Sequence, residues 1–423
     1  MAQRRWWLGL LAGVWACAAP TATVEGDGVS APEVSAQALP DGTADAETAP
    51  PDVPEPDTAD GLDAAGGATP APDAPGRFAV GTRSFDWFDV QRNRKVPTQI
   101  WYPCVQEGEL AQYLGLIAGH ALDGAAPDPK ALARPVLLFS HGFKGINVQS
   151  FSILEHVASH GFVVVAPNHV GNTLTDNASN QEVAQVSLER PRDLAFALAQ
   201  VLAASQPGGE LAGLVDGTRV AVSGHSFGGW TALVVAGGVL DVDAAKAACA
   251  AGAPSDIFCK YLEFWPKGAT VQLDAAVPGL RAAVYYAPGG YSSFGDPGIG
   301  KVHVPGLVMG GTLDDTTTLA AEITPIYAAH PLPKALAVIA NASHFSYTDI
   351  CSLSFAATMM KDYCGNPAVL DSGKAAHIAS ALTVAWLRRW LEDDAAMASW
   401  LQPAAVKARF ADLAEYAATG LAP

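Results

Sequence analysis

The feature that most constrains the fold is a serine placed at the junction of two segments of different character. The sequence GHSFG at residues 224–228 follows the β-prone run 219–223 and opens the helix-prone run 228–239. A serine on such a sharp turn projects its hydroxyl, and the glycines let the helix pack closely on the strand. The alternative is a serine that only caps the helix. The complete strand-turn-helix context favours a nucleophile at Ser226.

Short apolar runs alternate with helix-prone segments along the chain from residue 77. Strands are predicted at 135–140, 162–167, 219–223, 282–287, 302–309 and 336–340, and helices at 151–159, 192–204, 228–239 and 374–392. Two further β-prone runs, 78–88 and 96–102, predict an N-terminal β-hairpin. This alternation indicates the α/β class, with a mostly parallel central sheet flanked by helices. In such sheets ligands bind at the carboxyl ends of the strands.

The N-terminus has the layout of an export signal. Arg4 and Arg5 precede the apolar run 6–16, which is too short to span a bilayer. Residues 1–17 are therefore predicted to be a signal peptide. The run ends in VWAC, which resembles a bacterial lipobox with Cys17 as the lipidated residue, and the alternative is ordinary cleavage nearby followed by secretion. The sequence thus predicts export, as a membrane-anchored lipoprotein of the periplasm or cell surface, or otherwise as a secreted protein.

Residues 18–76 have the composition of a tether. They contain ten prolines and twelve acidic residues but no Lys, Arg or aromatic residue, which predicts a disordered, acidic Ala/Pro-rich segment. The tether also dominates the charge, because the whole chain carries −17 whereas residues 77–423 carry 23 basic and 30 acidic residues, or −7. An acidic chain without a basic domain argues against a nucleic-acid partner. Residues 77–423 are predicted to form the catalytic domain.

A second loop, 140–145, follows the predicted strand 135–140. Acyl-transfer chemistry needs two converging N–H donors that stabilise an oxyanion. By position, the predicted donors are the backbone N–H groups of Phe143 and of Phe227, the residue after the serine. The alternative is a plain glycine turn with a packed imidazole at His141.

The acid and the base are predicted from two later loops. Asp314 and Asp315 follow the predicted strand 302–309, and Asp314 is the third residue after a glycine. Asp315 is predicted to cap the next helix, which leaves Asp314 to orient a histidine. The histidine is predicted to be His344, which follows the strand 336–340.

These segments together resemble the α/β-hydrolase superfamily. The motifs are SHGFKG (140–145), GHSFGGW (224–230), GGTLDD (310–315), NASHF (341–345) and a strand ending in IWYP (100–103). Within the superfamily the chain is most similar to platelet-activating-factor acetylhydrolase and to bacterial dienelactone-hydrolase-like esterases, over about residues 77–395. The order serine, acid, histidine is that of the superfamily. Dienelactone hydrolases use cysteine where this chain has Ser226.

The resemblance implies an α/β-hydrolase fold and a serine carboxylic-ester hydrolase with the triad Ser226, Asp314 and His344. The implied substrate is a short-acyl phospholipid or a related lipid ester, as for platelet-activating-factor acetylhydrolase. No cofactor and no metal are expected, since the sequence has no metal-ligand or dinucleotide motif. Three alternatives remain: a cutinase-like or polyester hydrolase, a serine peptidase on the same fold, and a non-catalytic binding module. The sequence indicates no oligomeric state.

The cysteines of an exported protein are predicted to form local disulfides. The spacing pairs Cys249 with Cys259 and Cys351 with Cys364, and it leaves Cys104 as a buried free thiol.

Residues 241–279 interrupt the alternation and carry four aromatic residues in eight positions, among them Phe264 and Trp265. One interpretation is a lid whose apolar face contacts the substrate, and the other is a satellite core packed onto the domain. His169, at the end of the strand 162–167, is a further candidate for substrate contact, or else a polar loop residue.

Overall fold

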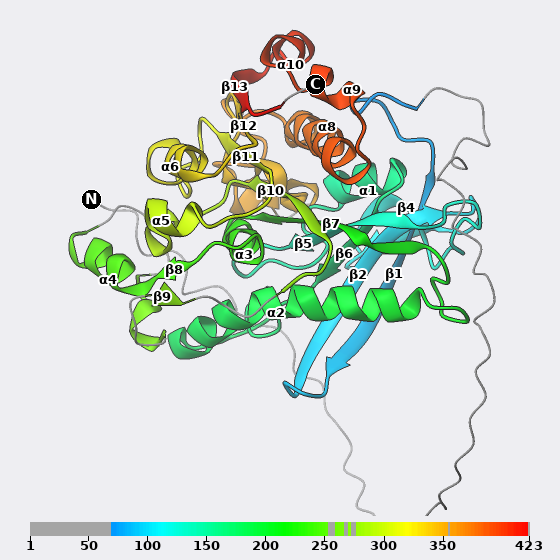
Figure 1. The fold of residues 1–423 in the computed structure, drawn as a ribbon, viewed down its shortest axis with the longest axis horizontal. Helices are drawn as coiled ribbons and strands as arrows, with labels where there is room; N and C mark the ends of the chain where they lie inside the picture. Colours follow the sequence, from blue (N-terminus) through cyan, green and yellow to red (C-terminus); the bar gives the residue numbers. More distant parts are fainter. Residues whose placement is uncertain (1–68, 253–258, 266–269, 272–275, 354–355, 422–423) are drawn as a thin grey trace, which may run out of the picture. The chain divides into compact units, whose positions relative to one another are not determined.

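The protein was analysed as a computed structural model that describes residues 69–252, 259–265, 270–271, 276–353 and 356–421. The predicted signal peptide, Cys17 and most of the predicted tether lie outside the described residues. The described part of the chain folds around one eleven-stranded sheet with the strand order β13-β12-β11-β10-β7-β5-β6-β2-β1-β4-β3 (Figure 1).

Six strands form the parallel centre of this sheet, and every neighbouring pair among them is parallel. They are β5 (Arg134–Ser140), β6 (Val163–Pro167), β7 (Val215–His225), β10 (Leu280–Tyr286), β11 (Gly306–Gly311) and β12 (Lys334–Ile339). Each overlaps one of the predicted strands, although β11 begins at Gly306 and not at the predicted residue 302. The carboxyl ends of these strands therefore lie along one edge of the sheet, which is where the predicted functional loops begin.

Further strands complete the sheet on both sides, in antiparallel pairs except for β1 and β4, which are parallel. The predicted hairpin is confirmed as β1 (Ala79–Asp89) and β2 (Arg94–Cys104), and β2 pairs antiparallel with β6. Three strands at or next to the edges of the sheet were not predicted, because they are short or partly exposed and lack a continuous apolar run. They are β3 (Leu110–Tyr113), β4 (Ile117–Asp123) and β13 (Leu413–Thr419). A separate two-stranded sheet joins β8 (Leu240–Asp241) to β9 (Thr270–Val271).

Helices cover both faces of the sheet (Figure 1). Alternate side chains of β5 point to opposite faces of the sheet. Val136 and Leu138 belong to the core under α2 (Asn180–Ala204) and α3 (Phe227–Val235). Leu137 and Phe139 belong to the core under α1 (Phe151–Ser159) and α8 (Ser372–Leu391). The shorter helices are α4 (Val242–Ala250), α5 (Gly295–Ile299), α6 (Thr324–Ala329), α7 (Ala356–Met359), α9 (Ala396–Trp400) and α10 (Pro403–Arg409). This arrangement is the α/β-hydrolase fold that the sequence predicts.

Helix α2 begins twelve residues before the predicted start at residue 192, at Asn180. A capping box between Ser179 and Glu182 satisfies its first turn, and Pro191 lies inside the helix. The prediction was wrong because it placed the proline near the helix start. Burial of the segment that precedes Pro191 against the core keeps that part helical despite the missing N–H.

The folded unit begins earlier than the predicted boundary at residue 77. The carbonyl oxygens of Pro70, Pro72 and Ala74 accept hydrogen bonds from Arg388, His156 and His160, at 2.9, 2.9 and 3.0 Å. Residues 69–76 therefore pack on α1 and α8 and are not part of the tether. Among the described residues, no helix combines the length and the apolarity that crossing a membrane requires.

Both predicted disulfides are confirmed, Cys249–Cys259 and Cys351–Cys364, and Cys104 is a buried free thiol. Disulfides of this kind are typical of proteins that leave the cytoplasm.

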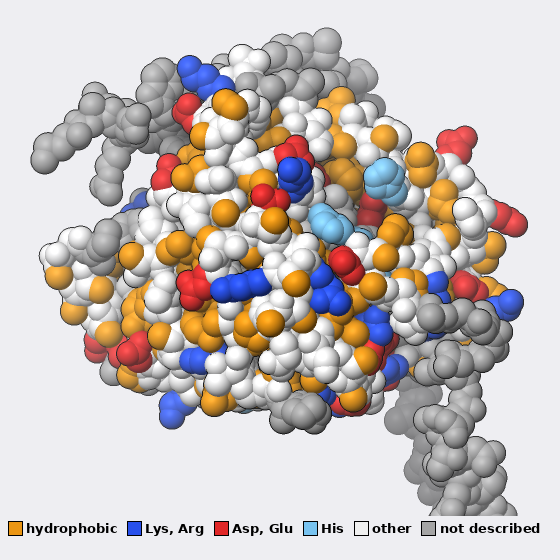
Figure 2. Space-filling model, turned by 90° about the horizontal axis from the view of Figure 1, so that it is seen from above, with side chains coloured by type: hydrophobic (Ala, Val, Ile, Leu, Met, Phe, Trp, Pro, Cys, Tyr) orange, Lys and Arg blue, Asp and Glu red, His pale blue; other side chains and the backbone are white. Residues whose placement is uncertain are grey.

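On the face shown in Figure 2, Lys and Arg side chains are scattered among acidic and hydrophobic groups rather than gathered in a stripe.

Candidate active site

Ser226 occupies a strained turn between β7 and α3. Its backbone has φ 57° and ψ −115°, and its N–H donates to the carbonyl oxygen of Tyr286 at 2.9 Å. The two flanking glycines are sterically required, because a Cβ at Gly224 would lie 2.2 Å from the carbonyl oxygen of Gly228. A Cβ at Gly228 would lie 1.8 Å from the carbonyl oxygen of Ser140. The close packing predicted from the GHSFG sequence is therefore confirmed.

His344 and Asp314 meet at the carboxyl ends of β12 and β11. Both side chains are buried, and Nδ1 of His344 lies 2.9 Å from Oδ2 of Asp314. The backbone N–H groups of Thr316 and Thr317 donate to Oδ1 of Asp314, at 2.9 and 2.7 Å. Burial alone raises the pKa of Asp314, but the charge and hydrogen bond of His344 and the donors of Thr317 outweigh it, so the pKa is lowered. An ionised carboxylate therefore faces the imidazole at neutral pH.

Asp315 lies outside this contact. Its carboxylate is exposed and accepts a hydrogen bond from the Tyr363 hydroxyl at 3.3 Å. The prediction that Asp315 caps the next helix is wrong, since the hydroxyl of Thr318 accepts from the N–H of Ala321 there, at 3.2 Å. Asp314 itself binds the two N–H groups of the turn, so one carboxylate both orders the loop and orients His344.

A chain of hydrogen bonds that the sequence did not indicate joins the two sides of the site. Oε1 of Gln149 accepts from the N–H of Gly142, and its Nε2 donates to Nδ1 of His225, at 3.1 and 3.0 Å. His225 is the residue before Ser226, and its Nε2 donates to the carbonyl oxygen of His344 at 2.9 Å. Burial lowers the pKa of His225 to about 3, so its ring is neutral and holds this tautomer.

The loop after β5 lies against the serine turn as predicted. A Cβ placed on Gly142 would lie 3.5 Å from Cβ of Ser226, and the rings of Phe143 and Phe227 lie 6.3 Å apart. His141 is a packed imidazole, the alternative considered from the sequence. It is fully buried, and its Nδ1 lies 2.8 Å from the carbonyl oxygen of Gly142.

The chain is similar in sequence to two groups of known proteins, chlorophyllases and cutinases. The family model described as Chlorophyllase matches residues 125–276. Cutinase est1 of Thermobifida alba is 24% identical over 286 residues, 67% of this chain and 69% of that protein. Cutinase 2 of Thermobifida cellulosilytica is 23% identical over 282 residues, 66% of this chain and 77% of that protein. Chlorophyllase-1, chloroplastic, of Citrus unshiu is 36% identical over 100 residues, 24% of this chain and 28% of that protein.

The chain belongs to the α/β-hydrolase superfamily of serine esterases. Within the described residues of this α/β-hydrolase, no group of three His, Cys, Asp or Glu side chains could hold a metal ion.

His169 is not placed to contact a substrate, which corrects that part of the prediction. Its side chain is fully buried, with Nε2 2.9 Å from the Ser140 hydroxyl and Nδ1 3.0 Å from Oδ2 of Asp193. Both ring nitrogens are thus engaged inside the α/β-hydrolase core. The error arose because a position at a strand end does not determine whether a side chain points into solvent or into the protein.

The described residues of the 241–279 insertion support one interpretation at Trp265 and leave the other open at Phe264. Trp265 belongs to the core: it is 3% exposed, its indole donates to the Ser187 hydroxyl at 3.0 Å, and it packs on Trp230. Phe264 is 42% exposed. The neighbouring Tyr261 ring lies 6.2 Å from the Phe143 ring, so the insertion reaches the predicted oxyanion loop. Phe258, the fourth aromatic residue of this segment, lies outside the described residues.

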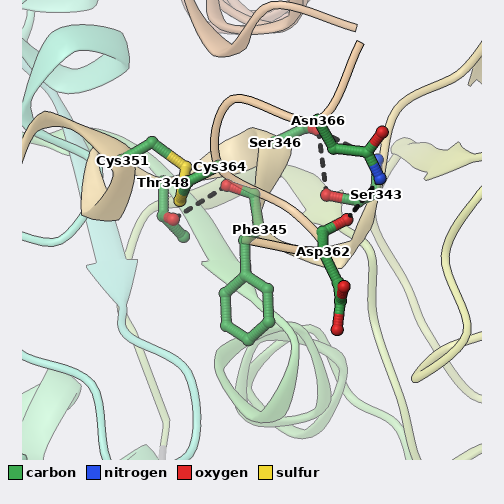
Figure 3. Close-up of a disulfide and its surroundings, with 8 residues drawn as sticks. All are labelled: Ser343, Phe345, Ser346, Thr348, Cys351, Asp362, Cys364 and Asn366. Atoms are coloured by element: carbon green, nitrogen blue, oxygen red, sulfur yellow. Dashed lines mark hydrogen bonds between the residues drawn. A yellow bond between two sulfur atoms is a disulfide. The ribbon is translucent and has the colours of Figure 1, made fainter. Parts of the chain in front are cut away.

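A disulfide-bonded loop follows the turn that carries His344. Figure 3 shows this turn together with the Cys351–Cys364 disulfide, and the N–H of Ser343 donates to the Ser346 hydroxyl at 2.9 Å. A cavity of about 340 Å³ is lined by Ser343, Phe345 and Ser346 of this turn, by Cys351 and Tyr363 of the disulfide loop, and by residues between 365 and 372. The disulfide thus supports one wall of a cavity that adjoins the histidine turn.

Proposed function

We propose that the chain hydrolyses carboxylic esters through an acyl-enzyme, with Ser226 as nucleophile, His344 as general base and Asp314 as the orienting acid. One observation carries the proposal. The imidazole of His344 is held by Asp314 at Nδ1, while its backbone is held by His225, the residue before the serine. The hydrogen bonds leave Nε2 of His344 as the atom that takes a proton from the serine.

The chemistry follows from these positions. The Ser226 hydroxyl oxygen attacks the ester carbonyl while His344 accepts its proton, and Asp314 stabilises the resulting imidazolium. The backbone N–H groups of Phe143 and Phe227 are the proposed donors to the tetrahedral oxyanion. His344 then returns the proton to the departing alcohol, and a water molecule hydrolyses the acyl-enzyme by the same steps.

For the substrate, we propose an ester with an apolar acyl or alcohol part. The similarity to cutinases supports a cutinase-like or polyester substrate, the alternative left open by the sequence. The finer prediction of a platelet-activating-factor acetylhydrolase-like activity on short-acyl phospholipids stays a prediction. The bonded His344–Asp314 pair counts against a non-catalytic binding module.

One substrate panel tests both levels of this proposal. It contains p-nitrophenyl esters from acetate to decanoate, a phospholipid with an sn-2 acetyl group, a polyester film and a peptide amide. We expect hydrolysis of the esters and none of the amide. Turnover of the film with little phospholipid hydrolysis supports the cutinase-like assignment, and the reverse supports the phospholipid assignment. Amide cleavage at rates like those of the esters contradicts the proposal.

The exposed Phe264 is predicted to contact apolar substrates, whereas Trp265 is predicted to act on stability. Changing Phe264→Ser should raise KM for a decanoate ester about fivefold, since about 1 kcal/mol of apolar burial is lost. KM for the acetate ester should stay unchanged. Changing Trp265→Ser should instead lower the free energy of unfolding by about 3–5 kcal/mol, measured by urea denaturation.

The control is Leu332→Ser, which removes an exposed apolar residue near the amino end of β12, away from the carboxyl ends of the strands. If Phe264→Ser affects both esters equally, or Leu332→Ser reproduces its effect, the insertion does not contact the acyl chain.

We also propose that the mature protein is anchored through a lipid on Cys17, on the basis of the basic start, the short apolar run and VWAC. Changing Cys17→Ala should move the protein from the membrane fraction to the soluble fraction, measured by immunoblotting after fractionation. Unchanged partitioning of the variant contradicts lipidation and leaves the secreted form.

A further inference from the structure

We propose that Arg190, a buried residue of α2, is a positioning residue for the oxyanion hole: it holds the loop that carries Phe143 and the ring of Phe227. The inference rests on the proposed function, because it assigns those two backbone N–H groups to the oxyanion. The chemistry of Ser226, His344 and Asp314 does not itself require a cation from α2 between these two segments.

The guanidinium of Arg190 is fully buried and bonds the oxyanion loop directly. Its Nη2 donates to the carbonyl oxygen of His141 and to the Ser140 hydroxyl, the latter at 3.1 Å. His141 lies two residues before Phe143. The cation therefore holds the part of the loop that precedes Phe143.

The same guanidinium acts on the far side of Phe143 through one intermediary. Its Nη1 donates to Oδ1 of Asn172 at 3.0 Å, and the same oxygen accepts from the N–H of Lys144 at 3.4 Å. Lys144 has a left-handed backbone, with φ 52°, which an L-residue adopts only when its surroundings hold it. Phe143 is thus flanked on both sides by groups that Arg190 orders.

Arg190 also reaches the second proposed donor. Its guanidinium carbon lies 4.4 Å from the centre of the Phe227 ring, and its Nε donates to the Thr231 hydroxyl at 3.0 Å. Both residues belong to the first turns of α3, directly after the nucleophile. One planar cation therefore sets the separation of the two segments whose N–H groups must converge.

If Arg190 only filled space in the core, a charged side chain would not be needed at this position. Burying a cation is costly, and an apolar side chain of similar size fills space without that cost. Burial lowers the pKa of Arg190 to about 9, which leaves the group charged at neutral pH, next to the carboxylate of Asp193. Its hydrogen bonds go to Ser140 and His141 of the loop, to Asn172 and to Thr231 of α3, rather than to Asp193.

The test compares Arg190→Met with Arg94→Met. Arg94 belongs to the same ionic cluster and donates to both oxygens of Asp193, at 2.8 Å each, and these hydrogen bonds do not involve residues 140–144. For Arg190→Met we expect kcat for p-nitrophenyl butyrate to fall about 100-fold with KM within threefold. Inhibition by an alkylboronic acid, which forms a tetrahedral anion on the serine, should weaken by the same factor. Arg94→Met should change neither quantity by more than threefold.

Two further variants keep the test decisive if Arg190→Met does not fold. Arg190→Lys keeps the charge but lacks the planar fork, and we expect it to recover stability while kcat stays at least tenfold low. Asn172→Ala removes the side chain that links Arg190 to the N–H of Lys144, and it should lower kcat about tenfold. Its effect should be less than additive in the Arg190→Lys background.

Equal losses in Arg190→Lys and Arg94→Met, or a loss confined to KM, overturn the positioning role while leaving the esterase proposal intact. A wild-type protein that hydrolyses no ester overturns both. A wild-type protein that is active, with boronic acid inhibition unchanged by all the Arg190 and Asn172 variants, overturns only the inference about Arg190.

Discussion

Ser226→Ala should lower kcat/KM for p-nitrophenyl butyrate by at least about 10⁵-fold, because the variant has no nucleophile and only binding and the oxyanion donors remain. His344→Ala should be nearly as damaging. The double variant should be no worse than Ser226→Ala alone, since the serine and the histidine act as one unit. Circular dichroism and thermal unfolding should show that both variants keep the fold.

The matched control is Ser223→Ala, on strand β7, which leads into the turn of the nucleophile. Its hydroxyl is buried and donates to the carbonyl oxygen of Leu138 at 3.1 Å, so the change removes a buried hydrogen bond without touching the site. Activity within threefold of wild type is expected. Ester hydrolysis that survives in Ser226→Ala would place the nucleophile elsewhere in the chain.

Asp314→Asn should lower kcat by about 10⁴-fold, whereas Asp315→Asn should change it by less than threefold. An amide at position 314 can donate to Nδ1 of His344, which favours the tautomer that cannot take the serine proton, and it removes the charge that stabilises the imidazolium. The exposed carboxylate of Asp315 accepts a hydrogen bond from the Tyr363 hydroxyl and is not bonded to His344. Steady-state kinetics on the butyrate ester measure both effects.

Asp315→Asn is itself the control, because the two substitutions are chemically identical and adjacent. A larger loss in Asp315→Asn than in Asp314→Asn would mean that the carboxylate bonded to His344 in the structure is not the one that acts in catalysis. A loss in Asp314→Asn that comes with a large fall in melting temperature would instead identify the ordering of residues 314–317 as its main role.

Several features of this protein could be predicted from short stretches of sequence because their physical causes are local. The glycines around Ser226 are dictated by contacts within one turn and with the adjacent strand, so the motif identifies the turn by itself. The alternation of apolar runs and helical segments determines the parallel sheet and hence the edge at which loops gather. The disulfides join cysteines ten and thirteen residues apart, so proximity along the chain sufficed.

Other features depend on which side chains meet across the fold. His169 and His344 both follow buried strands, yet one is enclosed by Ser140 and Asp193 while the other faces Asp314. Phe264 and Trp265 are neighbours in the sequence, but only the tryptophan finds a buried partner in α2. Helix α2 begins well before Pro191 because packing outweighs a local break signal.

The contacts that organise the site are long-range and carry no motif. Gln149 joins Gly142 to His225, which lies 76 residues after Gln149 in the chain. Arg190 joins the loop 140–145 to helix α3, which follows Ser226. The sequence by itself determined the class of fold, the serine turn and the loops from which the acid and base come. It also selected Asp314 and His344, which pair in the structure. The tertiary structure decided that His169 is enclosed in the core and that Gln149, His225 and Arg190 connect the segments of the site. These contacts join distant segments, so they depend on distances and burial that only the packed chain defines.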